Sequence, residues 1–237
     1  MTVHVLKKES ENTNARNEMQ RRGLDCTSTW FVRNLRKAKI LKGINIGDQC
    51  KSWDVLKSLE FIENNVPING PILDIGAYAS EMLCSLHQMN YTSLTGVDVN
   101  PHIIDMPHAD TIRYLVSDFM HTPFEDASFA AITAISVIEH GFNGHALLTE
   151  LSRILKPGGY FIASVDYWPD KINTTDIKAF GMDWQIFSQP ELISLLEEAR
   201  SFGLAPAGDL KFEAADPIIK WQGRQYTFAW LVLKKNG

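Results

Sequence analysis

The sequence has few cysteines, no long apolar run and no clustered metal-ligand residues. Its 237 residues include three cysteines, Cys26, Cys50 and Cys84, which is an odd number with wide spacing. This argues against a disulfide framework or a structural zinc site and favours a reducing compartment such as the cytoplasm. No stretch approaches the roughly 18 apolar residues of a membrane-spanning helix, and the first ten residues lack a secretory signal pattern. We therefore expect a cytoplasmic protein with no membrane partner.

Positive charge is scarce outside the beginning of the chain. Residues 1–50 contain ten Lys or Arg against five Asp or Glu, whereas residues 51–237 contain thirteen against twenty-three. An acidic main body is a poor electrostatic match for a nucleic-acid backbone, so we expect no nucleic-acid partner. The basic start either holds an acidic substrate or forms solvated helix faces.

The hydrophobic pattern predicts alternating strands and helices after residue 70. Predicted strands cover 71–76, 94–99, 112–116, 129–137, 160–165, 210–214 and 226–233. Predicted helices cover 29–41, 52–66, 82–89, 145–155 and 188–202, and the first 20 residues are expected to be frayed. This order predicts an α/β fold with a doubly wound, seven-stranded, mostly parallel sheet. The short connection before the last strand predicts that it lies antiparallel beside the sixth.

Acidic residues stand at the ends of the first three predicted strands. Asp74, Asp98 and Asp118 are separated by 24 and 20 residues, each about one strand–helix unit. Ligands of open parallel sheets bind beyond these strand ends. There a first carboxylate can hold a ligand ammonium, a second both hydroxyls of a ribose and a third an adenine amino group. Gly76 permits a tight turn between them. The set suits a nucleoside with a positively charged amino-acid tail.

Five stretches in this order resemble class I, Rossmann-like S-adenosylmethionine-dependent methyltransferases. They are Ile72-Leu73-Asp74-Ile75-Gly76, Gly96-Val97-Asp98, Ser117-Asp118-Phe119, Ile135-Ser136-Val137-Ile138-Glu139-His140 and the segment 148–162 with Lys156-Pro157-Gly158-Gly159. The resemblance covers roughly residues 70–235. It implies a methyltransferase domain over 70–237, an N-terminal helical segment over 1–69 that acts as a lid, and S-adenosyl-L-methionine as cofactor. The residues implied to bind the cofactor are Asp74, Gly76, Ala77, Tyr78, Asp98, Val99, Asp118, Phe119, Ala134 and Ile135.

The glycine loop departs from the Gly-x-Gly-x-Gly pattern of this family. Here it is Gly76-Ala77-Tyr78-Ala79-Ser80, with only the first glycine. Either the loop is reshaped and Tyr78 contacts the ligand, or cofactor binding has been lost and the chain serves as a non-catalytic binding or assembly partner. A dinucleotide-binding protein needs the second glycine for close approach to a pyrophosphate, so Tyr78 argues against that class.

The position facing the methyl acceptor in this family is occupied by Glu139 and His140. The pKa of an ordinary histidine suits a general base near neutrality, and methyl transfer needs a base when the accepting atom must lose a proton. Alternatively, Glu139 caps the following helix and His140 is a surface turn residue. His145 is expected on the helix surface, and the spacing of these residues matches no metal motif, so no metal is expected.

The sequence lacks the motifs of two classes of methyl acceptor. No Asn/Asp-Pro-Pro-Tyr/Phe loop follows the fourth strand, which weakens methylation of amino groups on adenine, cytosine or glutamine. Glu139 alone does not supply the paired glutamates associated with arginine methylation. A small-molecule methyl acceptor for O- or N-methylation, such as a sugar, a natural-product intermediate or a phenol, remains. Trp184, Phe187 and Trp221 indicate an apolar acceptor if exposed and only core if buried.

Overall fold

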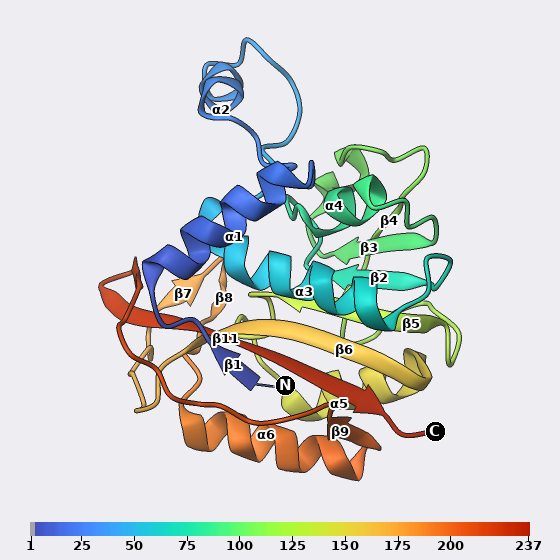
Figure 1. The fold of residues 1–237 in the computed structure, drawn as a ribbon, viewed down its shortest axis with the longest axis vertical. Coiled ribbons are helices and arrows are strands. Elements are labelled where there is room, and N and C mark those ends of the chain that lie inside the picture. Colours follow the sequence, from blue (N-terminus) through green and yellow to red (C-terminus); the bar gives the residue numbers. More distant parts are fainter. Residues whose placement is uncertain (1–2) are drawn as a thin grey trace.

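The computed structural model describes residues 3–237, which form a twisted sheet with helices on both faces (Figure 1). The sheet has the order β1-β11-β6-β5-β2-β3-β4, and β9 and β10 also pair with β11. Its strands are β1 Val3–Val5, β2 Ile72–Ile75, β3 Leu94–Asp98, β4 Arg113–Val116, β5 Phe129–Ile135, β6 Leu155–Tyr167, β9 Leu204–Pro206, β10 Ile219–Trp221 and β11 Arg224–Lys235. A separate hairpin pairs β7 Lys178–Ala179 with β8 Met182–Asp183. The helices are α1 Glu9–Arg21, α2 Trp30–Lys37, α3 Ser52–Asn65, α4 Met82–Gln88, α5 Gly144–Ile154 and α6 Gln189–Ser201, with short 3-10 turns η1 Gln49–Lys51 and η2 Pro101–Asp105.

Five neighbouring strands confirm the predicted doubly wound α/β class. β4, β3, β2, β5 and β6 are parallel and lie side by side in this order. The strand order reverses between β2 and β5, and this is the place where open α/β sheets bind ligands. The main path over the described residues contains six of the seven predicted strands and the unpredicted β1, and its β11 is antiparallel to β6 as expected for the last strand.

The prediction of a strand over 210–214 was wrong. The alternating Leu210, Phe212 and Ala214 resemble a strand, yet the segment makes only an isolated bridge from Leu210 to Val3. β1 and β9 pair with β11 instead, so the edge position beside the last strand is already filled. β11 therefore lies between β1 and β6 rather than beside a strand at 210–214.

The prediction of a frayed start was also wrong. β1 joins the sheet and α1 forms a 13-residue helix. The helix buries only Ala15, Arg16 and Met19, so its apolar stripe is weak in sequence. A charged contact holds the helix in place. The guanidinium nitrogens of Arg16 lie 2.7 Å from a carboxylate oxygen of Glu81 and 2.9 Å from one of Asp25. Because a buried charge must be paired, this contact fixes α1 against the beginning of α4.

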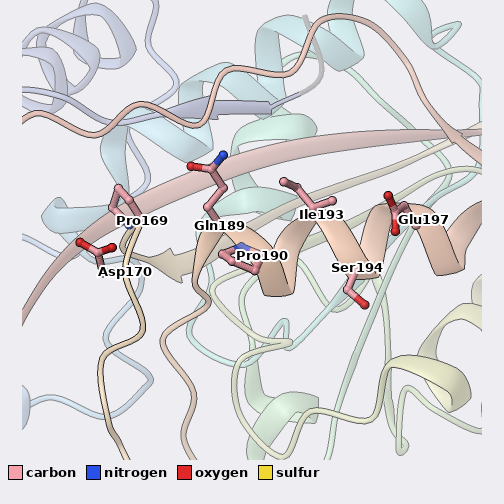
Figure 2. Close-up of a pocket in the computed structure, with 7 residues that line it drawn as sticks. All are labelled: Pro169, Asp170, Gln189, Pro190, Ile193, Ser194 and Glu197. Carbon is pink, nitrogen blue, oxygen red and sulfur yellow. The ribbon is translucent and has the colours of Figure 1, made fainter.

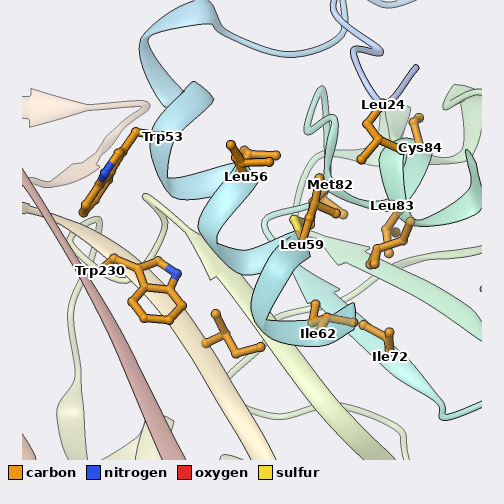
Figure 3. Packing of buried hydrophobic residues seen from close by; sticks show 14 of the residues in the cluster. Leu24, Trp53, Leu56, Leu59, Ile62, Ile72, Met82, Leu83, Cys84 and Trp230 are labelled. Carbon is orange, nitrogen blue, oxygen red and sulfur yellow. The ribbon is translucent and has the colours of Figure 1, made fainter. Parts of the chain in front are cut away.

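Two apolar cores cover the two faces of the sheet. α1, α3 and α4 pack on one face with Ile72, Ala131 and Ile162, as Figure 3 shows around α3. α5 and α6 pack on the other face with the alternate residues Leu73 and Ile132. This period-two division is the signature of a strand covered on both faces. It holds the strand ends, and hence the site, in place.

Residues 28–46, which we call the lobe, extend away from the sheet and carry α2 (Figure 1). The predicted basic amphipathic helix is confirmed as α2. The neck of the lobe is closed by Ser28, whose N–H donates to the carbonyl of Ile46 at 2.9 Å. Beside the neck, the N–H of Gly47 donates to the carbonyl of Ala79 at 2.7 Å, so the lobe adjoins the glycine loop. Within the described residues, no helix is long and apolar enough to cross a bilayer.

Candidate functional site

The carboxyl edge of the sheet carries a row of acids, one from each parallel strand or the loop after it. The strand order places them as Asp118, Asp98, Asp74, Glu139 and Asp166, from β4 to β6. Asp118, Asp98, Asp74 and Glu139 are predicted site residues. The structure brings them to one edge because parallel strands end on the same side.

Asp74 is buried at the centre of this row. Its Oδ1 accepts a hydrogen bond from the hydroxyl of Thr133 at 2.6 Å, and its Oδ2 has no partner. Burial, helped by the neighbouring Asp98, raises the pKa of the Asp74 carboxyl to about 7. A buried acceptor without a donor suits the ammonium of a ligand, because that group would supply both the hydrogen bond and the charge.

Asp98 fixes the glycine loop to the end of β3. One carboxylate oxygen accepts from the N–H of Tyr78 at 3.0 Å and the other from the N–H of Asn100 at 2.8 Å. Each oxygen keeps acceptor capacity for a ribose hydroxyl, since a carboxylate has about four acceptor positions. Val99, the next residue, is 58% exposed and lies open for a ligand.

The loop accommodates its missing glycines. Gly76 has φ +72°, and a Cβ there would lie 2.3 Å from Val137 Cγ2, so this position requires glycine. The second left-handed residue is Ala79, with φ +62°, whereas Tyr78 and Ser80 avoid that region as predicted. The Ser80 hydroxyl accepts from the N–H of Met82 at 3.1 Å at the start of α4. The loop is therefore a folded turn with Ala77 buried beneath it.

The remaining predicted cofactor residues lie just beyond β4 and at the end of β5. Asp118 is exposed just beyond β4, and its Oδ1 accepts from the N–H of Met120 at 2.9 Å. Phe119 is half-buried against the core. Ala134 and Ile135 end β5 next to the crevice, the first buried and the second half-buried.

Glu139 and His140 are held in the loop after β5. The alternative in which Glu139 caps α5 is wrong, because the Asn143 side chain accepts from the N–H of Ala146 there. Glu139 is fully buried and neither carboxyl oxygen has a partner. Burial and the nearby Asp166 raise its pKa well above the usual value. His140 is half-buried beside Phe180, and burial with Lys51 nearby lowers its pKa to about 4.

Two charged residues that were not predicted from the sequence reach this edge from the N-terminal segment. Asp54 of α3 is buried; its Oδ2 accepts from the Ser164 hydroxyl at 2.6 Å, and burial raises its pKa to about 6. Lys51 of η1 donates to the hydroxyl of Ser136 and lies 3.5 Å from the centre of the Phe228 ring. A signal existed for Asp54, because an acid flanked by Trp53, Val55 and Leu56 stands in an apolar part of its helix.

The aromatic residues near β6 are mostly core. Trp184 and Phe187 are buried, and Trp221 is half-buried with its ring centroid 4.8 Å from that of Trp184. The indole N–H of Trp184 donates to Oδ2 of Asp166 at 2.8 Å. Trp184 therefore positions an acid of the row. His145 is exposed at the start of α5, as predicted.

A surface depression of about 490 Å³ lies apart from these residues. Figure 2 shows it at the beginning of α6, where Asp170 and Glu197 are among the lining residues. None of the predicted site residues lines it.

Comparison with known proteins agrees with the geometry of the crevice. Residues 73–163 match the family described as a methyltransferase domain. A sterol 24-C-methyltransferase of Gibberella zeae is 28% identical over 98 residues, which cover 38% of this chain and 26% of that protein. An O-methyltransferase of Pyrenophora dematioidea is 27% identical over 147 residues, covering 58% and 54% of the two chains. The chain thus spans about a quarter to a half of these relatives.

Solved structures show the same fold. A geranyl diphosphate methyltransferase in complex with S-adenosylmethionine superposes with a TM-score of 0.56 and 16% identity, over 76% of this chain and 84% of that one. Residues 73–163 thus match a methyltransferase domain, and the described chain has the fold of solved S-adenosylmethionine-dependent methyltransferases.

The buried Asp74 carboxyl predicts a pH-dependent stability. Its pKa is raised on folding, so the native state holds an extra proton between about pH 4 and pH 7, and stability falls as pH rises through that window. Between pH 5 and pH 7.5 the wild type should lose more unfolding free energy than Asp74→Asn loses, by on the order of 2 kcal/mol. Urea unfolding at both pH values measures it, with the exposed Asp110→Asn as control. Equal losses in the wild type and Asp74→Asn would contradict the prediction.

Proposed function

We propose that this chain transfers a methyl group from S-adenosylmethionine to a hydroxyl or amine of a small-molecule acceptor. The observation that carries the proposal is the unpartnered, buried Oδ2 of Asp74 beside the glycine loop and Asp98. The match of residues 73–163 to a methyltransferase domain supports the cofactor, and the relatives named as sterol and O-methyltransferases support a small acceptor.

Each predicted cofactor residue would contact a different part of S-adenosylmethionine. Asp74 would hold the ammonium of its methionine part, the loop from Gly76 to Tyr78 would lie along that part, and Asp98 would accept the ribose hydroxyls. Val99, Asp118 and Phe119 would surround the adenine at one end. Ala134 and Ile135 would line the floor. Each polar role matches an acceptor that the chain leaves available.

Methyl transfer needs little covalent catalysis from the protein. S-adenosylmethionine supplies an electrophilic methyl group on a positively charged sulfur. The chain must hold the accepting atom in line with it, which by itself can supply several kcal/mol. His140, neutral above about pH 5 because its pKa is near 4, would take the proton of a hydroxyl acceptor. Glu139, which is buried and precedes His140 in the chain, would orient the acceptor.

A second candidate function is supported by the altered loop. Tyr78 and Ser80 replace two family glycines, which favours a non-catalytic protein that binds or assembles with a partner. The two functions differ in a single measurable property, the affinity for the cofactor product.

Titration with S-adenosylhomocysteine separates these functions. We expect micromolar binding, weakened about 100-fold by Asp98→Ala, because two hydrogen bonds from ribose hydroxyls to a carboxylate are lost. Asp110→Ala, an exposed acid beyond η2, should bind as the wild type does. Calorimetry that shows no binding at high micromolar ligand, or an Asp98→Ala variant of unchanged affinity, would support the non-catalytic function.

The role of His140 can be tested separately. His140→Gln should lower kcat at least ~100-fold while the affinity for S-adenosylhomocysteine stays within about twofold, because general-base catalysis contributes that range. The wild-type kcat at saturating cofactor should fall as pH drops through about 4, where His140 becomes protonated. Transfer of a labelled methyl group to acceptors of a sugar and phenol panel measures it, with the exposed His145→Gln as control. Unchanged turnover in His140→Gln removes it as the base.

We further propose that the lobe is the moving part of an N-terminal lid. Trp30 and Phe31 on α2 are 78% and 63% exposed, and the neck is hydrogen-bonded next to the glycine loop. Exposed aromatic side chains beside a ligand crevice gain apolar contacts if the lobe closes over it. Acrylamide quenching of Trp30, isolated by subtracting a Trp30→Phe variant, should decrease when S-adenosylhomocysteine binds. Quenching that is unaffected by saturating ligand would exclude closure.

A further inference from the structure

Buried hydrogen-bond acceptors without donors gather at one place in the molecule. Among the described residues, seven buried side-chain nitrogen or oxygen atoms have no partner. Four of them are carboxyl oxygens of Asp54, Glu139 and Asp166, which we call the acidic cluster. Buried polar groups are nearly always hydrogen-bonded, and an unpaired one costs free energy. The chain therefore provides too few hydrogen-bond donors for the carboxyl oxygens of the acidic cluster.

The charges in the cluster are not balanced either. Lys51 is the cation beside it, but its ammonium is 4.0 Å from Oδ1 of Asp166, beyond hydrogen-bond distance. That ammonium donates instead to Ser136 and faces the Phe228 ring. Three carboxyl groups thus share one cation that contacts none of them closely. The raised pKa values of all three follow from this burial without adequate pairing.

The cluster lies at the same edge of the sheet as Asp74, on the side of β5 and β6. Glu139 follows β5 and Asp166 is near the end of β6, next to the half of the crevice with Asp74. Asp54 closes the cluster from α3, and its Oδ2 is tied to Ser164 of β6. Of the charged side chains here, Lys51 is the one that reaches solvent, with 22% exposure against 4% for Asp166. The open side is therefore at Lys51.

We propose that Glu139 and Asp166 form a subsite for the ammonium group of the methyl acceptor, which makes the acceptor a small polar amine. The identity of this ligand as a methyl acceptor rests on the proposed function; the preference for an amine rests on the cluster. An ammonium brings three donors and one positive charge, which are the two things that the cluster lacks. A hydroxyl brings one donor and no charge. Within the described residues, no three such side chains are arranged to hold a metal ion.

Matched probes test the subsite in the full chain. Tyramine and tyrosol differ by an amine in place of a hydroxyl, as do glucosamine and glucose. We expect the amine of at least one pair to bind at least ~10-fold more tightly than its hydroxyl partner, because it makes a charge-assisted contact. Calorimetry, with and without saturating S-adenosylhomocysteine, measures this. No preference in either pair, including no detectable binding of any probe, overturns the proposal.

Two isosteric variants test whether Glu139 and Asp166 cause the preference for the amine probe. Glu139→Gln and Asp166→Asn should each reduce it to within about twofold, since an amide cannot become an anion when the ligand binds and adds a donor where the site needs acceptors. Asp176→Asn is the matched control: it is exposed, belongs to the loop after β6, and has φ +69°, which asparagine tolerates. A preference that survives in both cluster variants overturns the assignment.

Stability distinguishes a ligand subsite from a structural pair. Because the acceptors are unpartnered in the free protein, Glu139→Gln should leave the thermal midpoint unchanged or raise it. A midpoint several degrees lower would show a structural role and overturn the proposal. Binding of S-adenosylhomocysteine alone is measured in the same variants. Its absence in the wild type rejects the proposed function, whereas its presence without amine preference rejects only the subsite.

Discussion

The burial of carboxyl groups without donors is the constraint on which the site depends. Asp74, Glu139 and Asp166 are at most 3% exposed, and each has an oxygen without a partner. Burying such groups is unfavourable, so the surrounding structure must supply the stability. The two apolar cores on either side of the sheet do so, and they hold the acids in fixed positions before any ligand arrives. The positively charged, donor-rich ligand that we propose would therefore meet acceptors already in place.

The N-terminal segment is part of this organisation. α3 contributes Asp54 and η1 contributes Lys51 to the edge formed by β5 and β6. α1 is fixed through Arg16 to Glu81, which immediately precedes α4 and follows the glycine loop. β1 adds a strand to the same sheet. Only the lobe stands free of these contacts, and it is attached where the glycine loop turns.

The sequence pattern predicted the elements whose burial is apolar and periodic. The five parallel strands and helices α2 to α6 were expected close to their observed bounds, because their apolar residues repeat with the period of the element. α1 was missed because its buried side includes an arginine, and a charged contact has no periodic signal. The segment 210–214 alternated correctly but lost its place to Val3–Val5, more than 200 residues away. Competition for a sheet edge is not visible within a short window of sequence.

The sequence by itself determined the fold class and the acids at the first three strand ends, since strand–helix periodicity and parallel topology fix where such residues lie. The tertiary structure alone decided which carboxyl groups are buried and unpaired. It brought Lys51 and Asp54 to β5 and β6, gave the cap of α5 to Asn143 and left Glu139 free. These outcomes depend on contacts between residues distant in sequence, because burial and pairing are properties of the packed chain.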